Sequence, residues 1–577
     1  MKKKYIILLL ILGVIGTFGS CKEEFLDIKP AGSLDESLLG NTKGIDALLV
    51  GAYSMLDGVS SQFGWEAASS NWVYGSIRGL EANKGTDSGD QPDINPLQTF
   101  SETSTNPYLN TKWRAVYESI SRCNSVIMVT ASSLAAGKID QAAADLYVQQ
   151  ARALRGWYHF EAWRMWKNVP YIDEKTDVKV VTNDADISAQ IIADLTEGTK
   201  LPTDMDAVGK FNKTVCQVLL AKAMMQMNND NAGALTLLTA AKGGTKADGS
   251  AIGLATTYGE IFDIANRNGI EAVYTVQYSV NDGSGAWNAG WGEVLNFPYK
   301  SGGSPGGCCG FFNPTQEFVN SFRTSGGLPL LDFSYNSNPV ISDQGVAIAS
   351  PFVEDAGPLD PRLDWSVGRR GIPYWDWGPH TGADWIRDQT YSGPYSPKKQ
   401  VYKKSQEGQY TEVGNWTSGY TANGYRMIRY ADILLMIAEC QIETGDLAGA
   451  RTNVNLIRAR AANPAGFVKE ADGTTNAANY VINQYPASGA PFDTQANARL
   501  ALRMERKLEL GQEGHRWFDL NRWGNTVTEL NRALTYEKTM PWGNALYGSN
   551  TVGAEDVTFP IPQRQIDLSN GKLIQNR

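Results

Sequence analysis

Paired helical stripes constrain the fold of this chain more than any other feature of the sequence. In two places an apolar stripe at helical spacing is followed 14 residues later by a second stripe, with a short polar turn between them. This spacing is typical of tetratricopeptide-like antiparallel helix hairpins. The stripes are Leu220, Ala223, Met224 and Met227 before Ala234, Leu237, Leu238 and Ala241, and Ile433, Met436, Ile437 and Cys440 before Leu447, Ala450, Val454 and Ile457.

The pattern changes between about residues 270 and 425. Short β-branched or aromatic runs there are broken by Gly, Pro, Asn and Asp, which predicts a loop-rich segment with a few short strands. Long loops in a compact protein are usually functional. We therefore expect a mostly α fold whose helical scaffold is interrupted by one large irregular insertion.

The first 20 residues have the organisation of a bacterial lipoprotein signal peptide. Three lysines at positions 2–4 precede an apolar stretch from Tyr5 to Phe18, which is short for a membrane span, and two small residues precede Cys21. A thiol at the new N-terminus can carry acyl chains, and several acyl chains anchor a protein to a membrane. We expect lipidation at Cys21; the alternative is an ordinary secretory signal with an accidental cysteine.

The charge of the mature chain limits its partners. Removal of the three N-terminal lysines leaves 49 basic and 61 acidic side chains, a net charge of −12. Nucleic acids and anionic membrane surfaces are disfavoured as partners by this charge. No segment after Cys21 has the 18 to 20 consecutive apolar residues of a membrane span.

The remaining cysteines do not indicate a metal site. They lack CxxC spacing and the chain has only three scattered histidines, so zinc is not expected. Cys123, Cys216 and Cys440 fall within helical patterns and are interpreted as small buried side chains. The adjacent Cys308 and Cys309 form either a vicinal disulfide or two free thiols, and the sequence leaves both open.

Several segments, in their order along the chain, resemble the SusD/RagB family of Bacteroidetes outer-membrane nutrient-uptake lipoproteins. Each segment alone is weakly specific, but the order after a lipobox is strongly specific. The segments are EEFLDIKP after Cys21, ARALRGWYHFEAWRMWKNVPYI, DPRLDWSVG, YRMIRYADILLMIAECQIETGD, ERKLELGQEGHRWFDLNRWG and FPIPQRQIDLSNGKLIQN.

The resemblance implies a single tetratricopeptide-containing domain that binds a glycan at the cell surface. It also implies a partner, a SusC-like TonB-dependent transporter over which the lipoprotein sits as a lid. The acidic run after Cys21 resembles a surface-export signal, so we expect the anchored protein to face outward from the outer membrane. The expected divisions are a signal peptide (1–20), a lipidated tether (21–36) and a SusD-like domain (37–577), made of a helical scaffold (37–269), a loop-rich ligand-facing region (270–425), and C-terminal helices and tail (426–577).

Aromatic side chains in the glycine-rich loops are the candidate glycan-binding residues. A pyranose has apolar C–H faces that stack on a ring and a rim of hydroxyls that seeks hydrogen bonds. Family members carry their aromatic site on loops that correspond to about residues 65–105 and 280–315, which makes Trp287 and Trp291 the strongest candidates. The alternative is that these rings only pack the irregular half of the molecule. The further candidates are Trp65, Trp72, Tyr74, Arg78, Trp375, Asp376, Trp377 and Trp385, with Asp87, Asp90, Asp384 and Arg387 as polar neighbours.

No motif singles out a catalytic site. The segment EGHRWFDLNRWG places Glu513, His515 and Asp519 close together, but its alternating charges are more typical of an ion network at a helix end. A glycosidase needs two carboxylates about 5 to 9 Å apart, and the sequence distinguishes no such pair. The acidic loop with Asp87, Asp90 and Asp93 allows calcium but lacks EF-hand spacing. We expect a non-catalytic glycan-binding lipoprotein; a surface glycosidase, or a lid for a peptide or other nutrient, is the alternative.

Overall fold

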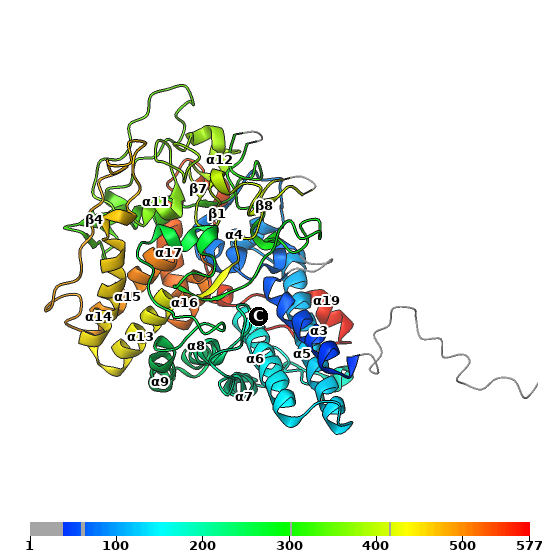
Figure 1. Cartoon of the computed structure of the whole chain (residues 1–577). Coiled ribbons are helices and arrows are strands. Elements are labelled where there is room, and N and C mark those ends of the chain that lie inside the picture. Colours follow the sequence, from blue (N-terminus) through cyan, green and yellow to red (C-terminus); the bar gives the residue numbers. More distant parts are fainter. Residues whose placement is uncertain (1–38, 59–63, 301–302, 415–416, 577) are drawn as a thin grey trace, which may run out of the picture.

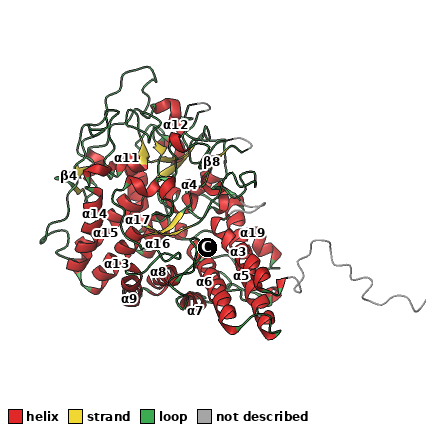
Figure 2. Ribbon diagram, in the orientation of Figure 1, coloured by secondary structure: helices red, strands yellow, loops and turns green. Residues whose placement is uncertain are grey.

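The structure is a computed structural model that describes residues 39–58, 64–300, 303–414 and 417–576. The expected signal peptide, the lipidation residue Cys21 and the tether lie outside the described residues. Within those ranges, no helix combines the length and apolar character needed to cross a bilayer. The described chain is mostly helical, with short strands in the loop-rich part, as the sequence predicts (Figures 1 and 2).

The N-terminal half is a layer of helices, most of which begin at a side-chain cap. The Asn106 side chain accepts a hydrogen bond from Tyr108 N ahead of α5, and Asp140 accepts one from Ala143 N ahead of α6. Helix α5 packs along α6, and both contact α3. The helices of this half are α3 (Thr42–Ser54), α4 (Ile94–Gln98), α5 (Pro107–Ala135), α6 (Gln141–Trp166), α7 (Ser188–Gly198), α8 (Lys213–Ala223) and α9 (Asn231–Lys242).

Both predicted helix hairpins are present. Helix α8 packs against α9, and α13 (Tyr430–Thr444) packs against α14 (Leu447–Ala461). The second helix of each hairpin starts at an aspartate, because Asp230 accepts a hydrogen bond from Gly233 N and Asp446 accepts one from Gly449 N. Helix α13 ends at Gly445, whose φ of 92° suits glycine. Since α13 also packs on α9, the two hairpins form one continuous helical layer.

The segment between β2 and β10 is irregular, and in Figure 2 it gathers with other loops above the helices. Its strands are short and pair only two at a time in the described chain, so no extended sheet forms there. Strand β10 pairs with β2 and thereby closes the insertion at its two ends. The strands are β1 (Ala82–Gly85), β2 (Ala272–Thr275), β3 (Phe311–Pro314), β4 (Thr324–Ser325), β5 (Leu328–Pro329), β6 (Val367–Gly368), β7 (Ser396–Pro397), β8 (Thr411–Glu412), β9 (Tyr420–Thr421) and β10 (Arg426–Arg429); the short helices α10 (Gln316–Asn320), α11 (Leu363–Ser366) and α12 (Gln389–Ser392) also lie here.

The C-terminal helices surround a buried set of charges. Helix α15 projects Glu505 and Glu509 into the protein, where arginines from α14, β10 and α11's N-terminal flank pair with them. We call this set the α15 ion cluster: Glu271, Arg362, Arg429, Arg458, Arg460, Glu505, Glu509 and Glu513. The remaining helices are α15 (Gln495–Leu510), α16 (Arg516–Arg522), α17 (Thr526–Glu537), α18 (Gly543–Tyr547) and α19 (Gln563–Leu568).

Candidate functional site

The loop at residues 279–293 presents a pair of stacked indole rings. The rings of Trp287 and Trp291 lie 5.0 Å apart between centroids and 16° from parallel. Trp291 stands edge-on to Tyr420, at a centroid distance of 4.9 Å, while Trp287 is 53 % exposed. One face of Trp287 is therefore backed by a second ring, and the outward side chain is open to solvent. This pair is the platform that a sugar ring would need.

Hydrogen bonds hold this loop in one shape. The Trp291 indole N–H donates to Ala286 O at 2.7 Å, and the Asn288 amide donates to Asp282 Oδ2 at 2.8 Å. Ser279 N donates to Asn288 O at 2.7 Å and closes the loop across its base. Because these bonds fix the loop before any ligand arrives, binding costs little conformational entropy.

Four of the candidate residues are core residues instead. Trp72 is buried and donates its indole N–H to Gly292 O at 2.9 Å, so it supports the Trp291 end of the loop from below. Tyr74 is buried with its hydroxyl donating to Glu66 O, and Arg78 is buried in ion pairs with Glu102 and Asp556. The ring of Trp385 packs edge-on to Tyr374 in a separate small core. None of the four offers a face to a ligand, which corrects the expectation that they line the site.

Trp65 is an intermediate case. Its side chain is half-buried against the main core, and its indole N–H donates to the hydroxyl of Tyr108 at 3.0 Å. The edge of the ring that could hydrogen-bond is therefore already used.

The Trp375–Trp377 turn forms a separate aromatic group. Trp375 lies 5.0 Å from Trp365 between ring centroids, and the Trp377 indole N–H donates to Tyr402 O at 2.9 Å. The exposed Asp376 carboxylate accepts hydrogen bonds from the backbone N–H groups of residues 404 and 405. Both tryptophans of the turn are only partly exposed, so the Trp287 loop is the better-exposed platform.

The acidic loop near Asp87 is neutralised by basic side chains. Arg387 pairs with Asp87 at 2.8 Å and with Asp90 at 2.6 Å, and its guanidinium lies 5.2 Å from the ring centre of Tyr299. Asp93 is exposed. Across the described residues, no group of three or more His, Cys, Asp or Glu side chains is arranged to hold a metal ion. The polar candidate Asp384 pairs with Lys300.

The structure decides between the disulfide and the two free thiols that the sequence left open for Cys308 and Cys309. Cys308 and Cys309 form a vicinal disulfide, and Cys309 N donates to Leu295 O across the insertion. Cys123, Cys216 and Cys440 are free and buried, which confirms their interpretation as small core side chains.

The segment EGHRWFDL forms ion pairs within the fold. Asp519 pairs with Arg506 at 2.8 Å, and Glu513 pairs with Arg429 and Lys399, both at 2.7 Å. These carboxylates are buried and their pKa values are held low by the neighbouring cations, in spite of burial. The geometry supports the structural interpretation of this segment.

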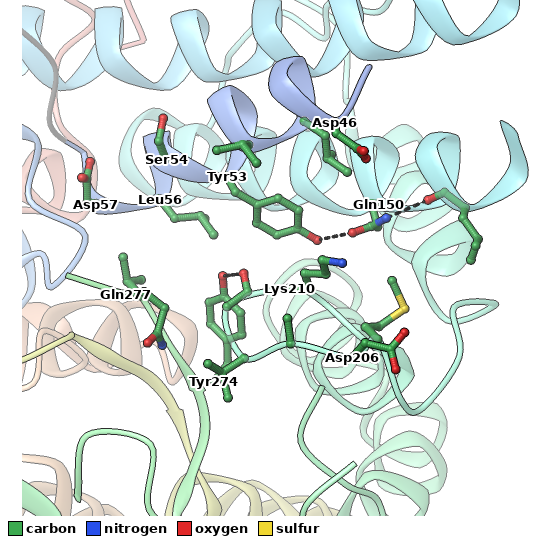
Figure 3. Close-up of a pocket in the computed structure, with 18 of the residues that line it drawn as sticks. Asp46, Tyr53, Ser54, Leu56, Asp57, Gln150, Asp206, Lys210, Tyr274 and Gln277 are labelled. Atoms are coloured by element: carbon green, nitrogen blue, oxygen red, sulfur yellow. Dashed lines mark hydrogen bonds between the residues drawn. The ribbon is translucent and has the colours of Figure 1, made fainter. Parts of the chain in front are cut away.

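A large cavity, drawn in Figure 3, has Ser279 and Asn288 of the Trp287 loop among its lining residues. Its volume is about 980 Å³; it is open to solvent on one side and is lined by residues of α3, α6, the 202–210 segment and the chain from β2 to Asn288. The Tyr53 hydroxyl donates to Gln150 Oε1 at 3.1 Å, and the Tyr274 hydroxyl donates to Gly209 O at 3.0 Å. Sequence reasoning missed this cavity, because its walls come from segments far apart in the chain and carry no common motif.

The fold defines a class of mostly α proteins in which paired helix hairpins carry a large loop-rich insertion. The sequence profile of the SusD family matches residues 270–577, more than half of the chain. The chain belongs to the SusD family.

Solved structures share the fold over most of both chains. A laminarin-binding SusD-like protein is 21 % identical with a TM-score of 0.64, covering 93 % of this chain and 99 % of its own. Surface glycan-binding protein A from Bacteroides thetaiotaomicron, in complex with laminarihexaose, is 20 % identical with a TM-score of 0.64 and the same coverage. A SusD superfamily protein from Bacteroides vulgatus is 19 % identical with a TM-score of 0.62, covering 94 % and 99 %. None of the curated protein sequences matches the chain significantly.

Proposed function

We propose that the mature protein is a non-catalytic, lipid-anchored glycan-binding protein of the outer-membrane surface. It captures an oligosaccharide and delivers it to a SusC-like TonB-dependent transporter. The observation that carries the proposal is the Trp287–Trp291 stack, because an exposed, rigidly backed indole matches the apolar face of a pyranose. Family membership and the glycan-binding structural neighbours support the same function.

The loop also supplies the polar rim that sugar hydroxyls need. Asn281, Asp282 and Asn288 are exposed around Trp287; the amide N–H groups of the two asparagines donate within the protein, and the exposed oxygens of all three keep further acceptor capacity. Hydrogen bonds to Ser284 and Asn288 hold the pKa of Asp282 well below its usual range, so this carboxylate stays an acceptor at neutral pH. A stacking face with a few polar neighbours gives moderate affinity, which suits a protein that must release its ligand to a channel.

Calorimetric titration of the mature chain tests the capture step. Residues 22–577 would be titrated with laminarihexaose and other oligosaccharides, alongside Trp287→Ala and the ring-preserving control Trp287→Phe. We expect the alanine variant to bind about 10- to 100-fold more weakly, because about 1.5–3 kcal/mol of ring burial and stacking is lost. The phenylalanine variant retains a stacking face and stays within about fivefold of the wild type.

Two results would contradict this function. Unchanged affinity in Trp287→Ala would show that Trp287 does not bind the glycan. Release of reducing sugar from any bound oligosaccharide would show that the protein is a glycosidase. The delivery step is tested by affinity purification of the lipidated protein from native membranes, in which a large β-barrel transporter is expected to copurify.

A further inference from the structure

The cavity beside the Trp287 loop is of the size of a ligand site. Its volume of about 980 Å³ lies at the upper end of the range of roughly 300–1,000 Å³ that is typical of small-molecule pockets. Figure 3 shows Tyr53 and Gln150 on the side of α3 and α6, and Tyr274 and Gln277 on the opposite wall. Such a volume accommodates more than one sugar unit.

The cavity and the tryptophan platform share a wall. Ser279 and Asn288 line the cavity, and Asn288 directly follows Trp287 in the chain. Ser279 N also donates to Asn288 O, so the wall is hydrogen-bonded at this point. The backbone between Trp287 and Asn288 therefore runs from the platform to the edge of the cavity.

The surfaces inside the cavity are those that sugars contact. Four tyrosines line it: Tyr53 is half-buried, the other three are buried and expose only part of a ring, and hydrogen bonds from all four hydroxyls fix the rings in place. Fixed aromatic faces beside amide and hydroxyl groups favour a hydroxylated ligand over a purely apolar one. The tyrosines are Tyr53, Tyr147, Tyr274 and Tyr278.

The charge of the lining restricts the ligand further. The cavity is lined by Asp46, Asp57, Asp204 and Asp206 but by one basic residue, Lys210, and no arginine or histidine is among its described lining residues. The exposed Asp282 adds a further negative charge on the Trp287 loop. Negative charges gathered in a concave site make the local electrostatic potential more negative, so they repel an anionic ligand.

We propose that the cavity is a second compartment of the binding site, which takes the continuation of an uncharged oligosaccharide and excludes chains that carry uronate or sulfate groups. This inference rests on the proposed glycan-binding function. It specifies the class of glycan and makes the site longer than the Trp287 platform alone.

Steric blocking tests whether the cavity is used. Val50 on α3 lines it and is 66 % exposed, so Val50→Trp places a bulky ring in the cavity without disturbing the core. The matched control is Val178→Trp, at a position that is 67 % exposed and lines neither the cavity nor the loop. We expect Val50→Trp to bind laminarihexaose at least tenfold more weakly while its affinity for laminaribiose is unchanged, and Val178→Trp to match the wild type for both.

Charge selection is tested with chains of equal length. Laminarihexaose is compared with a hexamer of galacturonic acid at low and at high salt. We expect the acidic hexamer to bind at least tenfold more weakly at low salt, with the gap narrowing as salt screens the charges. The double variant Asp204→Asn, Asp206→Asn keeps the side-chain shapes and is expected to bind the acidic hexamer several-fold more tightly, with laminarihexaose unchanged.

The outcomes separate this inference from the proposed function. If wild-type protein binds none of the oligosaccharides, the proposed function fails. If Trp287→Ala loses binding but Val50→Trp and Val178→Trp behave alike, the platform stands and the second compartment is overturned. Equal affinity for the acidic and neutral hexamers overturns the charge selection, and a crystal structure with residues 22–38 seated in the cavity overturns its role in glycan binding.

Discussion

The α15 ion cluster and the Trp287 loop invert the usual placement of side chains. In the cluster, charged groups are buried: Glu509 meets Arg362 at 3.1 Å, Arg429 at 3.0 Å and Arg460 at 2.5 Å. In the loop, a large aromatic ring faces solvent. Buried charges are tolerated because each has several partners, whereas the exposed ring has no structural partner on its outer side. The contrast indicates that the cluster maintains the fold, whereas the outer face of Trp287 contributes little to it, which fits the proposed role of the loop.

The largest expected effect is a loss of stability when the α15 ion cluster is disrupted. Glu509→Ala leaves three arginines short of a partner in a buried site, so we expect the free energy of unfolding to fall by about 3–5 kcal/mol. Urea denaturation followed by circular dichroism measures it. The control is Glu443→Ala, which removes the half-exposed pair with Arg499 and is expected to cost less than about 1 kcal/mol. Equal losses in the two variants would contradict the distinction, as would loss of glycan affinity in folded Glu509→Ala.

The second-largest expected effect concerns Glu293, a buried carboxyl group at the end of the Trp287 loop. Burial raises the pKa of Glu293 to about 7, and the Tyr278 hydroxyl donates to it at 3.3 Å. Since this pKa is higher in the folded than in the unfolded state, the stability it contributes is present below about pH 4.5 and is lost as the pH rises through 7. Between pH 5 and pH 8, the free energy of unfolding of the wild type should therefore fall by up to about 3 kcal/mol more than that of Glu293→Gln.

Urea titrations at several pH values test this expectation. The exposed control Glu118→Gln on α5 should retain the decline of the wild type. A Glu293→Gln variant with that same decline would show that Glu293 does not titrate in this range.

A third effect compares a buried tryptophan with the exposed one. Trp72→Phe removes the hydrogen bond to Gly292 O and leaves a gap in the core, so we expect a loss of about 2 kcal/mol in unfolding free energy. Glycan affinity should also fall slightly, because Gly292 adjoins Trp291. A free energy of unfolding equal to that of the wild type would show that Trp72 does not stabilise the loop.

The smallest expected effect is on the stability of the Trp287 variant. Trp287→Ala should change the free energy of unfolding by no more than about 0.5 kcal/mol, because the side chain is largely exposed. Thermal denaturation of the same preparations used for titration checks this. A loss of several kcal/mol would mean that the ring stabilises the loop and that weaker binding reports unfolding.

The helical part of the fold was predictable because its signals are local. The stripes of α13 and α14, and the turn at Gly445 and Asp446, are encoded within about 30 residues of sequence. The tail was less predictable: the segment VTFPIPQRQIDL contains two prolines and no helical stripe, yet Gln563–Leu568 forms the short helix α19. Six residues have too little periodicity to distinguish a helix from a loop.

The site was predictable only in part, because burial depends on distant partners. Trp72 is covered through Gly292, which is 220 residues away, and Arg78 is neutralised by Asp556 at the other end of the chain. A tryptophan in a glycine-rich loop has the same local sequence whether it packs or protrudes. The sequence therefore identified Trp287 and Trp291 together with residues that the fold buries, and it gave no sign of the cavity.

The exposure of Trp287 gives the protein a native optical reporter. Of the tryptophans in the described ranges, it alone has a mostly exposed side chain, so a neutral quencher such as acrylamide reaches its indole far more readily than the others. Among the tryptophans of the described ranges, the emission that such a quencher removes fastest should therefore come largely from this loop. A ligand that covers the ring would shield that emission and shift it to shorter wavelength, which makes loop occupancy visible in unlabelled protein.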